Sequence, residues 1–266
     1  MDIKPLYNLQ YGQLPVSVYS SNQELGQAAA KEAARIIDQA IQAKGVANII
    51  IATGNSQLTF LAALKTTEID WSKVNIFHMD EYVGIDPNNP ASFPVFLQKH
   101  LISYIHPLGF FPVKTQTDDL PGVCRDYETL LRKHPADLCA LGIGENGHLA
   151  FNDPSYADFN DPVWVKVVKL DNVSRQQQVG EGHFASLHDV PTHAITLTIP
   201  ALMAATYMLA MVPEARKATA VYKSLTDPIQ VACPATILRQ APHAHLFLDL
   251  DSAASILDRE GLRSRT

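Results

Sequence analysis

The sequence predicts a single-domain α/β protein with a three-layer, Rossmann-like fold around a largely parallel central sheet. Short apolar runs, typical of strands buried on both faces, alternate with segments that repeat apolar residues at helical spacing. No linker rich in proline, glycine or serine and no internal repeat divides the chain. At 266 residues and 47% hydrophobic content the chain can bury a substantial core, so we expect one domain over residues 1–266.

The strand candidates are apolar on successive residues, which favours strands covered by helices on both sides. They are Val46–Ala52, Val74–Met79, Asp137–Ile143, Val165–Leu170, Ala194–Ile199, Thr206–Val212 and Ala244–Leu250.

The first long helix is predicted between two of the strongest end signals in the chain. Ser21 and Glu24 form a capping-box pattern ahead of an apolar stripe that starts at Leu25, and Gly45 closes the segment. The stripe recurs at helical spacing, so the helix should pack one face on the sheet.

Composition excludes several classes of partner. The formal net charge of -6 leaves no basic stripe for a phosphate backbone, so we expect no nucleic acid partner. The cysteines Cys124, Cys139 and Cys233 have no metal-type spacing and are interpreted as reduced thiols of a cytoplasmic protein. No apolar stretch approaches the ~20 residues that span a bilayer, and the first residues are polar, so we expect no membrane partner and no signal peptide.

Polar residues follow the first central strand at the edge where open parallel sheets bind ligands. Thr53, Gly54, Asn55 and Ser56 lead into an apolar helix that begins near Gln57. Such a turn presents backbone N–H groups and hydroxyls, which favour a phosphate. An ordinary helix cap is an equally good interpretation of this turn by itself.

Two carboxylates, Asp80 and Glu81, follow the second central strand. Neighbouring side chains at a strand end diverge, so we do not expect a dyad that shares one proton. One of the two, Asp80 or Glu81, is predicted to face the pocket as a catalytic base. A solvated pair of loop carboxylates is the alternative.

The segment "LGIGENGHLAFNDP", residues 141–154, concentrates glycines around a histidine. Gly142, Gly144 and Gly147 permit a tight backbone approach, and His148 can titrate near neutral pH. Asp153 could fix the imidazole tautomer, which is the base-plus-orienter arrangement of acid–base catalysis. A metal site and a buried structural histidine are the alternatives, although no known zinc spacing is present and we expect no metal.

These motifs together resemble the glucosamine-6-phosphate deaminase family, also called glucosamine-6-phosphate isomerase, in the superfamily that includes 6-phosphogluconolactonase. "MDEYVGI" followed by "NPASFPVFL" is closer to the deaminase pattern than to the lactonase pattern, in which DER is usual. "LGIGENGHLAFNDP" is similar to the family's GIGxNGHIAFNEP segment, and "TGNS" to its phosphate loop. "LDNVSR" and "PEARKATAVYKSL" resemble two further phosphate-site elements.

The resemblance implies conversion of glucosamine 6-phosphate and water to fructose 6-phosphate and ammonia, within the catabolism of amino sugars such as N-acetylglucosamine. Asp80 would move a proton from carbon 2 to carbon 1, and His148 would open the pyranose ring. Asn146 and Asp153 match family positions beside this histidine, and Gly147 is a further candidate. The residues implied to bind the phosphate are Thr53, Gly54, Asn55, Ser56, Arg175 and Lys217. No cofactor is implied.

Asp153 departs from the family, which has glutamate at this position. The carboxylate is one methylene shorter and reaches roughly 1.5 Å less far, so we expect it to support His148 only after a backbone shift. A 6-phosphogluconolactonase-type ester hydrolase and a non-catalytic sugar-phosphate sensor remain the alternative functions. The expected partner is a small sugar phosphate, and the sequence leaves a homo-oligomer open.

Overall fold

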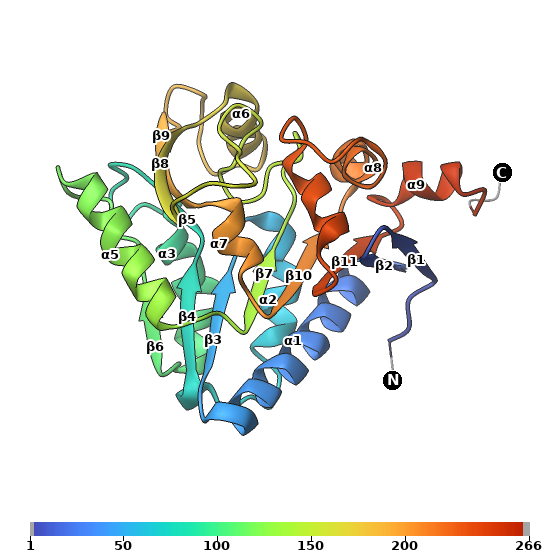
Figure 1. The fold of residues 1–266 in the computed structure, drawn as a ribbon, viewed down its shortest axis with the longest axis horizontal. Coiled ribbons are helices and arrows are strands. Elements are labelled where there is room, and N and C mark those ends of the chain that lie inside the picture. The colour runs from blue at the N-terminus through green and yellow to red at the C-terminus, as the bar shows by residue number, and fades with distance from the viewer. Residues whose placement is uncertain (1–2, 263–266) are drawn as a thin grey trace.

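An eight-stranded sheet forms the centre of the computed structural model, which describes residues 3–262 (Figure 1). The strand order is β1-β2-β11-β10-β7-β3-β4-β6, and every neighbouring pair is parallel except β1 with β2. Its strands are β1 (Tyr7–Tyr11), β2 (Leu14–Tyr19), β3 (Ala47–Ile51), β4 (Val74–His78), β6 (Gly109–Phe111), β7 (Leu138–Leu141), β10 (Tyr207–Val212) and β11 (Ala244–Asp249). The predicted single-domain α/β fold with a largely parallel sheet is confirmed.

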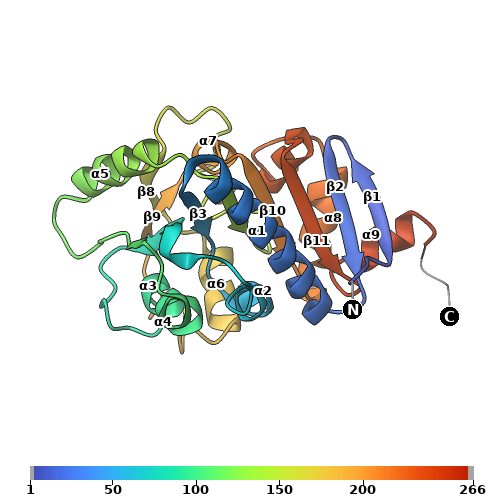
Figure 2. The ribbon, with the colours of Figure 1, turned by 90° about the horizontal axis from the view of Figure 1, so that it is seen from below.

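Helices cover both faces of this sheet and complete the three layers. One apolar cluster joins the sheet to α1 (Asn22–Lys44), α2 (Leu58–Leu64), α3 (Phe93–Leu97), the π-helical turn η3 (Gln98–Ile102) and α4 (Ser103–Ile105). A second cluster joins it to α5 (Leu120–Lys133), α7 (Ile199–Met203), α8 (Ala218–Thr226) and α9 (Ala254–Arg259). Figure 2 shows α2, α3 and α4 on one side of the strands, with α5 and α7 on the other. The short 3₁₀ turns are η1 (Asn55–Gln57), η2 (Trp71–Lys73), η4 (Ala215–Lys217) and η5 (Pro234–Gln240).

Helix α1 begins and ends as its sequence signals predict. The Ser21 hydroxyl accepts a bond from the backbone N–H of Glu24 at 3.3 Å, and the Glu24 carboxylate reaches back to Ser20. Gly45 has a φ of 81° and donates its N–H to the Ile41 carbonyl at 2.8 Å. The buried face of α1 packs against the strands of the central sheet, among them β3, which leads into the first predicted ligand-binding turn.

A separate three-stranded antiparallel sheet lies over the carboxyl ends of the central strands (Figure 1). It consists of β5 (Asp80–Tyr82), β9 (His193–Leu197) and β8 (Val165–Lys169) in this order. The assignment of Val165–Leu170 and Ala194–Ile199 to the largely parallel sheet was therefore wrong. Along β8 only Val165 and Val168 are buried, whereas Val167 and Lys169 are exposed, so this strand is not covered on both faces.

The hairpin of β1 and β2 and the short strand β6 were not predicted. Strand β1 is an edge strand with half-exposed residues, and β6 has only three residues, so neither presents a long apolar run. No helix among the described residues has the length and apolar character needed to cross a bilayer. The remaining helix, α6 (Asn172–Gly180), crosses above the central strands beside β8 (Figure 1).

Candidate active site

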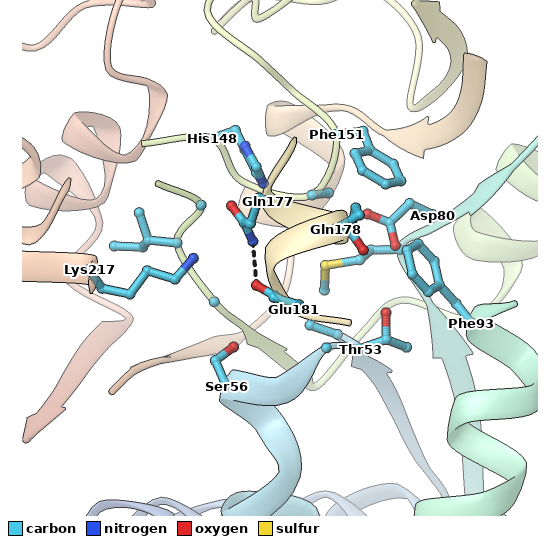
Figure 3. A pocket seen from close by; sticks show the side chains of 17 residues that line it. Thr53, Ser56, Asp80, Phe93, His148, Phe151, Gln177, Gln178, Glu181 and Lys217 are labelled. Atoms are coloured by element: carbon cyan, nitrogen blue, oxygen red, sulfur yellow. Dashed lines mark hydrogen bonds between the residues drawn. The ribbon is translucent and has the colours of Figure 1, made fainter. Parts of the chain in front are cut away.

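A pocket lies where the carboxyl ends of β3, β4 and β7 meet the small sheet and α6. Six residues singled out from the sequence line it (Figure 3). They are Thr53, Gly54, Ser56, Asp80, His148 and Lys217. The expected site therefore forms from four segments that are distant in sequence.

The turn after β3 forms one wall of the pocket. Gly54 has a φ of 101°, a conformation that L side chains rarely adopt, and the turn η1 follows it directly. The hydroxyls of Thr53 and Ser56 border the cavity. The amide of Asn55 instead donates to the Glu181 carbonyl at 3.1 Å and does not line the pocket.

Lys217 enters the same wall from the turn between β10 and α8. Lys217 is 3% exposed. Burial lowers the pKa of its ammonium, although the negative charge of Glu181 acts to raise that pKa. Figure 3 shows the ammonium directed into the cavity, toward Glu181 and Ser56. A buried cation among hydroxyls is suited to hold an anionic group.

Asp80 and Glu81 alternate across β5, so they face opposite sides as expected for adjacent strand residues. Asp80 lines the pocket and is 7% exposed. Burial, together with the negative charge of Glu81, raises the pKa of Asp80 well above its usual range. No donor among residues 3–262 hydrogen-bonds its carboxylate, which is the condition of a base that can accept a proton from a ligand.

Glu81 points away from the pocket and secures its rim. Its carboxylate accepts bonds from the Tyr82 N–H at 2.8 Å, the Ser92 hydroxyl at 2.6 Å and the Phe93 N–H at 3.2 Å. Burial outweighs these bonds and raises the pKa of Glu81 to about 7. Because Phe93 begins α3 and lines the pocket, Glu81 fixes that aromatic wall against β5.

A buried histidine that the sequence reasoning did not single out holds the backbone of Asp80. The Val113 N–H donates to His78 Nε2 at 2.9 Å, which leaves the proton on Nδ1 to donate to the Asp80 carbonyl at 2.9 Å. Burial lowers the pKa of His78 to about 4. The ring is therefore neutral at pH 7 and acts as a fixed bridge between β4 and Asp80.

His148 is held by a buried polar network on the other side of the pocket. Its Nδ1 lies 2.7 Å from Asn146 Oδ1, 3.0 Å from Ser174 Oγ and 3.1 Å from Asp153 Oδ1. Acceptors on three sides keep the proton on Nδ1 and leave Nε2 for the pocket (Figure 3). The network gives the imidazole one orientation and one tautomer.

Asp153 is fully buried and contacts His148 directly, so its shorter carboxylate does reach the imidazole in this structure. Asn146 Nδ2 donates to it at 2.9 Å, the Asp171 N–H donates at 3.1 Å, and the Ser174 hydroxyl also donates. Burial alone would raise its pKa, but the bonds from His148, Asn146 and Ser174 lower the pKa of Asp153 to about 2. Asp153 is thus a permanent anion behind the imidazole.

Glycines in this loop make room for the histidine. A Cβ on Gly144 would lie within 2.3 Å of three atoms of the His148 ring. Gly147 has a φ of 83°, and a Cβ there would meet Cys233 Sγ at 2.6 Å. Ala150, which lines the pocket, holds a φ of 51°, a left-handed conformation that costs a residue with a side chain roughly 1–2 kcal/mol. The loop is therefore fixed in a conformation that positions His148.

Arg175 is the one predicted phosphate ligand whose charged group turns away from the pocket. Its guanidinium donates to the carbonyls of Leu187 at 2.6 Å and Val190 at 2.9 Å. It thereby ties α6 to the segment before β9. Arg175 does not line the cavity.

Helix α6 supplies pocket residues that the sequence reasoning missed. Gln177 and Gln178 line the cavity together with Glu181, the residue that caps the helix. No local motif marks them, because they become pocket residues only when α6 crosses the carboxyl ends of the central strands. Among residues 3–262 no cluster of His, Cys, Asp and Glu has the arrangement of a metal site.

The chain is similar to known proteins over most of its length. Residues 20–247 match the model of the family described as glucosamine-6-phosphate isomerases/6-phosphogluconolactonase. Proteins named glucosamine-6-phosphate deaminase from Bacillus thuringiensis (strain Al Hakam) and Bacillus anthracis (strain A0248) are each 32% identical over 237 residues, which cover 89% of this chain and 87% of theirs.

Solved structures give the same result. A monomeric glucosamine-6-phosphate deaminase superposes with a TM-score of 0.83 at 27% identity, covering 93% of this chain and 99% of its own. A 6-phosphogluconolactonase from Shewanella baltica OS155 superposes with a TM-score of 0.74 at 19% identity, covering 88% and 97%, a similarity that concerns the fold.

Proposed function

Since the chain belongs to the family of glucosamine-6-phosphate isomerases and 6-phosphogluconolactonases, we propose that it is a deaminase that converts glucosamine 6-phosphate and water to fructose 6-phosphate and ammonia. The observation that carries the proposal is the pairing of two groups in one pocket. Asp80 is a buried carboxylate with a raised pKa, and His148 is an imidazole fixed by an anion. The names of the Bacillus relatives support the same reaction.

In this proposal the phosphate binds at the wall made by the 53–56 turn and Lys217. Hydroxyls, backbone N–H groups and one buried ammonium recognise a phosphate in ground and transition states alike. Binding at this end orients the sugar carbons toward Asp80. Arg175 remains a predicted phosphate ligand that would first have to release the carbonyls of Leu187 and Val190.

His148 opens the pyranose ring: its Nε2 takes the proton of the anomeric hydroxyl and passes it to the ring oxygen as the bond between carbon 1 and that oxygen breaks, which leaves the open-chain aldehyde. Asp153 and Asn146 keep the other nitrogen protonated and hold the ring in place. The permanent charge of Asp153 stabilises the imidazolium that forms when Nε2 takes up a proton.

Asp80 then takes the proton from carbon 2 of the open-chain amino sugar and returns it to carbon 1. Its raised pKa matters for both halves of the transfer. It makes the carboxylate a stronger base toward a carbon acid, and it lets the protonated form persist long enough to deliver the proton. Loss of ammonia with addition of water then completes the reaction.

Lactone hydrolysis is the second candidate, because several lactonases share the fold. The pair of His148 and Asp153 alone would suffice to activate water for that reaction. Lactone hydrolysis by this pair would leave the buried carboxylate of Asp80 without a role. The presence of that carboxylate in the pocket therefore favours the deaminase. A non-catalytic sugar-phosphate sensor would need neither group.

A coupled assay tests the proposal: fructose 6-phosphate and ammonia are measured together from glucosamine 6-phosphate, in parallel with hydrolysis of 6-phosphogluconolactone. We expect the two products in equal amounts and no lactone hydrolysis above the uncatalysed rate. Lactone hydrolysis without ammonia release would reverse the ranking, and binding of the sugar phosphate without either reaction would favour the sensor.

A further inference from the structure

The pocket contains an acidic side chain in the wall assigned to the phosphate. Glu181 lines the cavity together with Ser56 and Lys217, and its side chain is 5% exposed (Figure 3). Gln177 Nε2 donates to its carboxylate at 2.8 Å, and Arg216 Nη1 donates at 3.1 Å. A substrate phosphate would meet this negative charge at close range.

The charges around Lys217 explain why a carboxylate lies there. Lys217 is buried and forms no direct salt bridge within residues 3–262, and among the carboxylates that compensate its charge Glu181 has the largest effect. A buried cation without a counter-charge is costly. Arg216 is itself a cation and adds to the positive charge beside Lys217; it pairs with Glu181 at 3.1 Å and with Glu214 at 2.6 Å, and it lies 3.7 Å from Glu145.

The side chain and the backbone carbonyl of Glu181 are held by separate sets of contacts. Its backbone carbonyl accepts the Asn55 amide at 3.1 Å, so the main chain is tied to the 53–56 turn. The carboxylate itself is held by Gln177, Arg216 and His183, whose Nε2 lies 3.5 Å away. The carboxylate can therefore leave while the backbone of the phosphate turn stays in place.

We propose that Glu181 is an internal counter-ion of Lys217, and that the phosphate of the substrate displaces its carboxylate on binding. The inference rests on the proposed function for the identity of the phosphate ligand. The carboxylate neutralises the buried ammonium before binding and competes with every anion that enters. Glu181 thus sets the affinity of the site for phosphate and disfavours weakly charged competitors.

The experiment is titration calorimetry with inorganic phosphate and with fructose 6-phosphate on wild type and on Glu181→Gln. The glutamine keeps the size of the side chain and removes the charge. We expect both ligands to bind about tenfold or more tightly to the variant, because one like charge is removed from a poorly solvated site. Glu214→Gln is the matched control: it makes the same change of charge beside the same Arg216, but outside the pocket, and should change affinity less than about twofold.

Unchanged or weaker phosphate binding by Glu181→Gln, with binding to wild type intact, would overturn the inference and leave the proposed function standing. If neither protein binds either ligand, both the inference and the proposed function fail. Glu181→Ala, which lacks the amide, must tighten phosphate binding in the same direction and covers a glutamine variant that fails to fold.

Discussion

Replacing Asp153 by asparagine removes the anion behind His148 while keeping the size of the side chain. In the folded protein the pKa of this carboxyl falls from an ordinary 3.8 to about 2, because the bonds from His148, Asn146 and Ser174 outweigh the effect of burial. That difference corresponds to between about 2 and 3 kcal/mol of folding free energy held by the ionised group. Asp153→Asn should lower the free energy of unfolding at pH 7 by about this amount.

The sign of the pH dependence follows from the lowered pKa. The contribution is fully present above the unfolded-state pKa near 4 and is lost as the pH falls through about 2. The difference between wild type and variant should therefore be constant from pH 7 to 5 and fall to about half at pH 3. Urea unfolding followed by circular dichroism at each pH measures it, provided that the denaturant slopes agree.

Asp158→Asn is the control, because Asp158 is exposed and only five positions away in sequence. It should change the free energy of unfolding by less than about 0.5 kcal/mol. The reasoning is refuted if Asp153→Asn matches wild type at pH 7, or if its deficit persists undiminished at pH 3. In the second case the loss would come from packing and not from charge.

Three further predictions concern the proposed base, the phosphate site and the carboxylate next to the base. Asp80→Asn should lower kcat by ~10²–10⁴-fold or more and stop exchange of the carbon 2 hydrogen in heavy water, while calorimetry still detects substrate binding. Exchange at the wild-type rate would mean that another group is the base, and Glu81 would be tested first. Lys217→Met should mainly raise KM, since a phosphate contact acts in ground and transition states, and a loss confined to kcat would contradict it. Glu81→Gln should move the acid limb of the kcat/KM profile to lower pH, because the charge of Glu81 contributes to the raised pKa of Asp80; an unmoved limb would show that burial alone sets that pKa.

The central sheet could be predicted because its strands are buried on both faces. Runs such as Val46–Ala52 and Thr206–Val212 are apolar at successive positions, and only a sheet covered on both sides accommodates them. The small sheet could not be separated from it by local pattern. Val165–Leu170 is a good strand in either setting, and only tertiary pairing of β8 with β9 decides its sheet.

The site likewise has a part that the sequence predicts and a part that only the tertiary structure determines. The 53–56 turn, Asp80 and His148 follow central strands, so the topology of a parallel sheet already brings them to one edge. Glu181 belongs to a polar helix whose amides and acids are ordinary for a solvated surface. Its burial comes from the crossing of α6 over the pocket, which no local spacing encodes.

Two aspartates, Asp80 in the pocket wall and Asp153 buried behind His148, have environments that drive their pKa values in opposite directions. Asp153 is surrounded by donors, including Asn146 and Ser174, whose bonds outweigh the effect of burial, so the group stays ionised. Asp80 has burial without donors and a second carboxylate next in sequence, so its charged form is disfavoured. The first group can therefore only stabilise a neighbouring charge, whereas the second, with its raised pKa, is the one suited to take up and release a proton. In the proposed aldose–ketose reaction, one carboxylate must stay charged beside the imidazole and another must take up and release a proton, both within one sugar length. The hydrogen-bond donors around each carboxylate, more than its residue type, determine which of these two roles it can take.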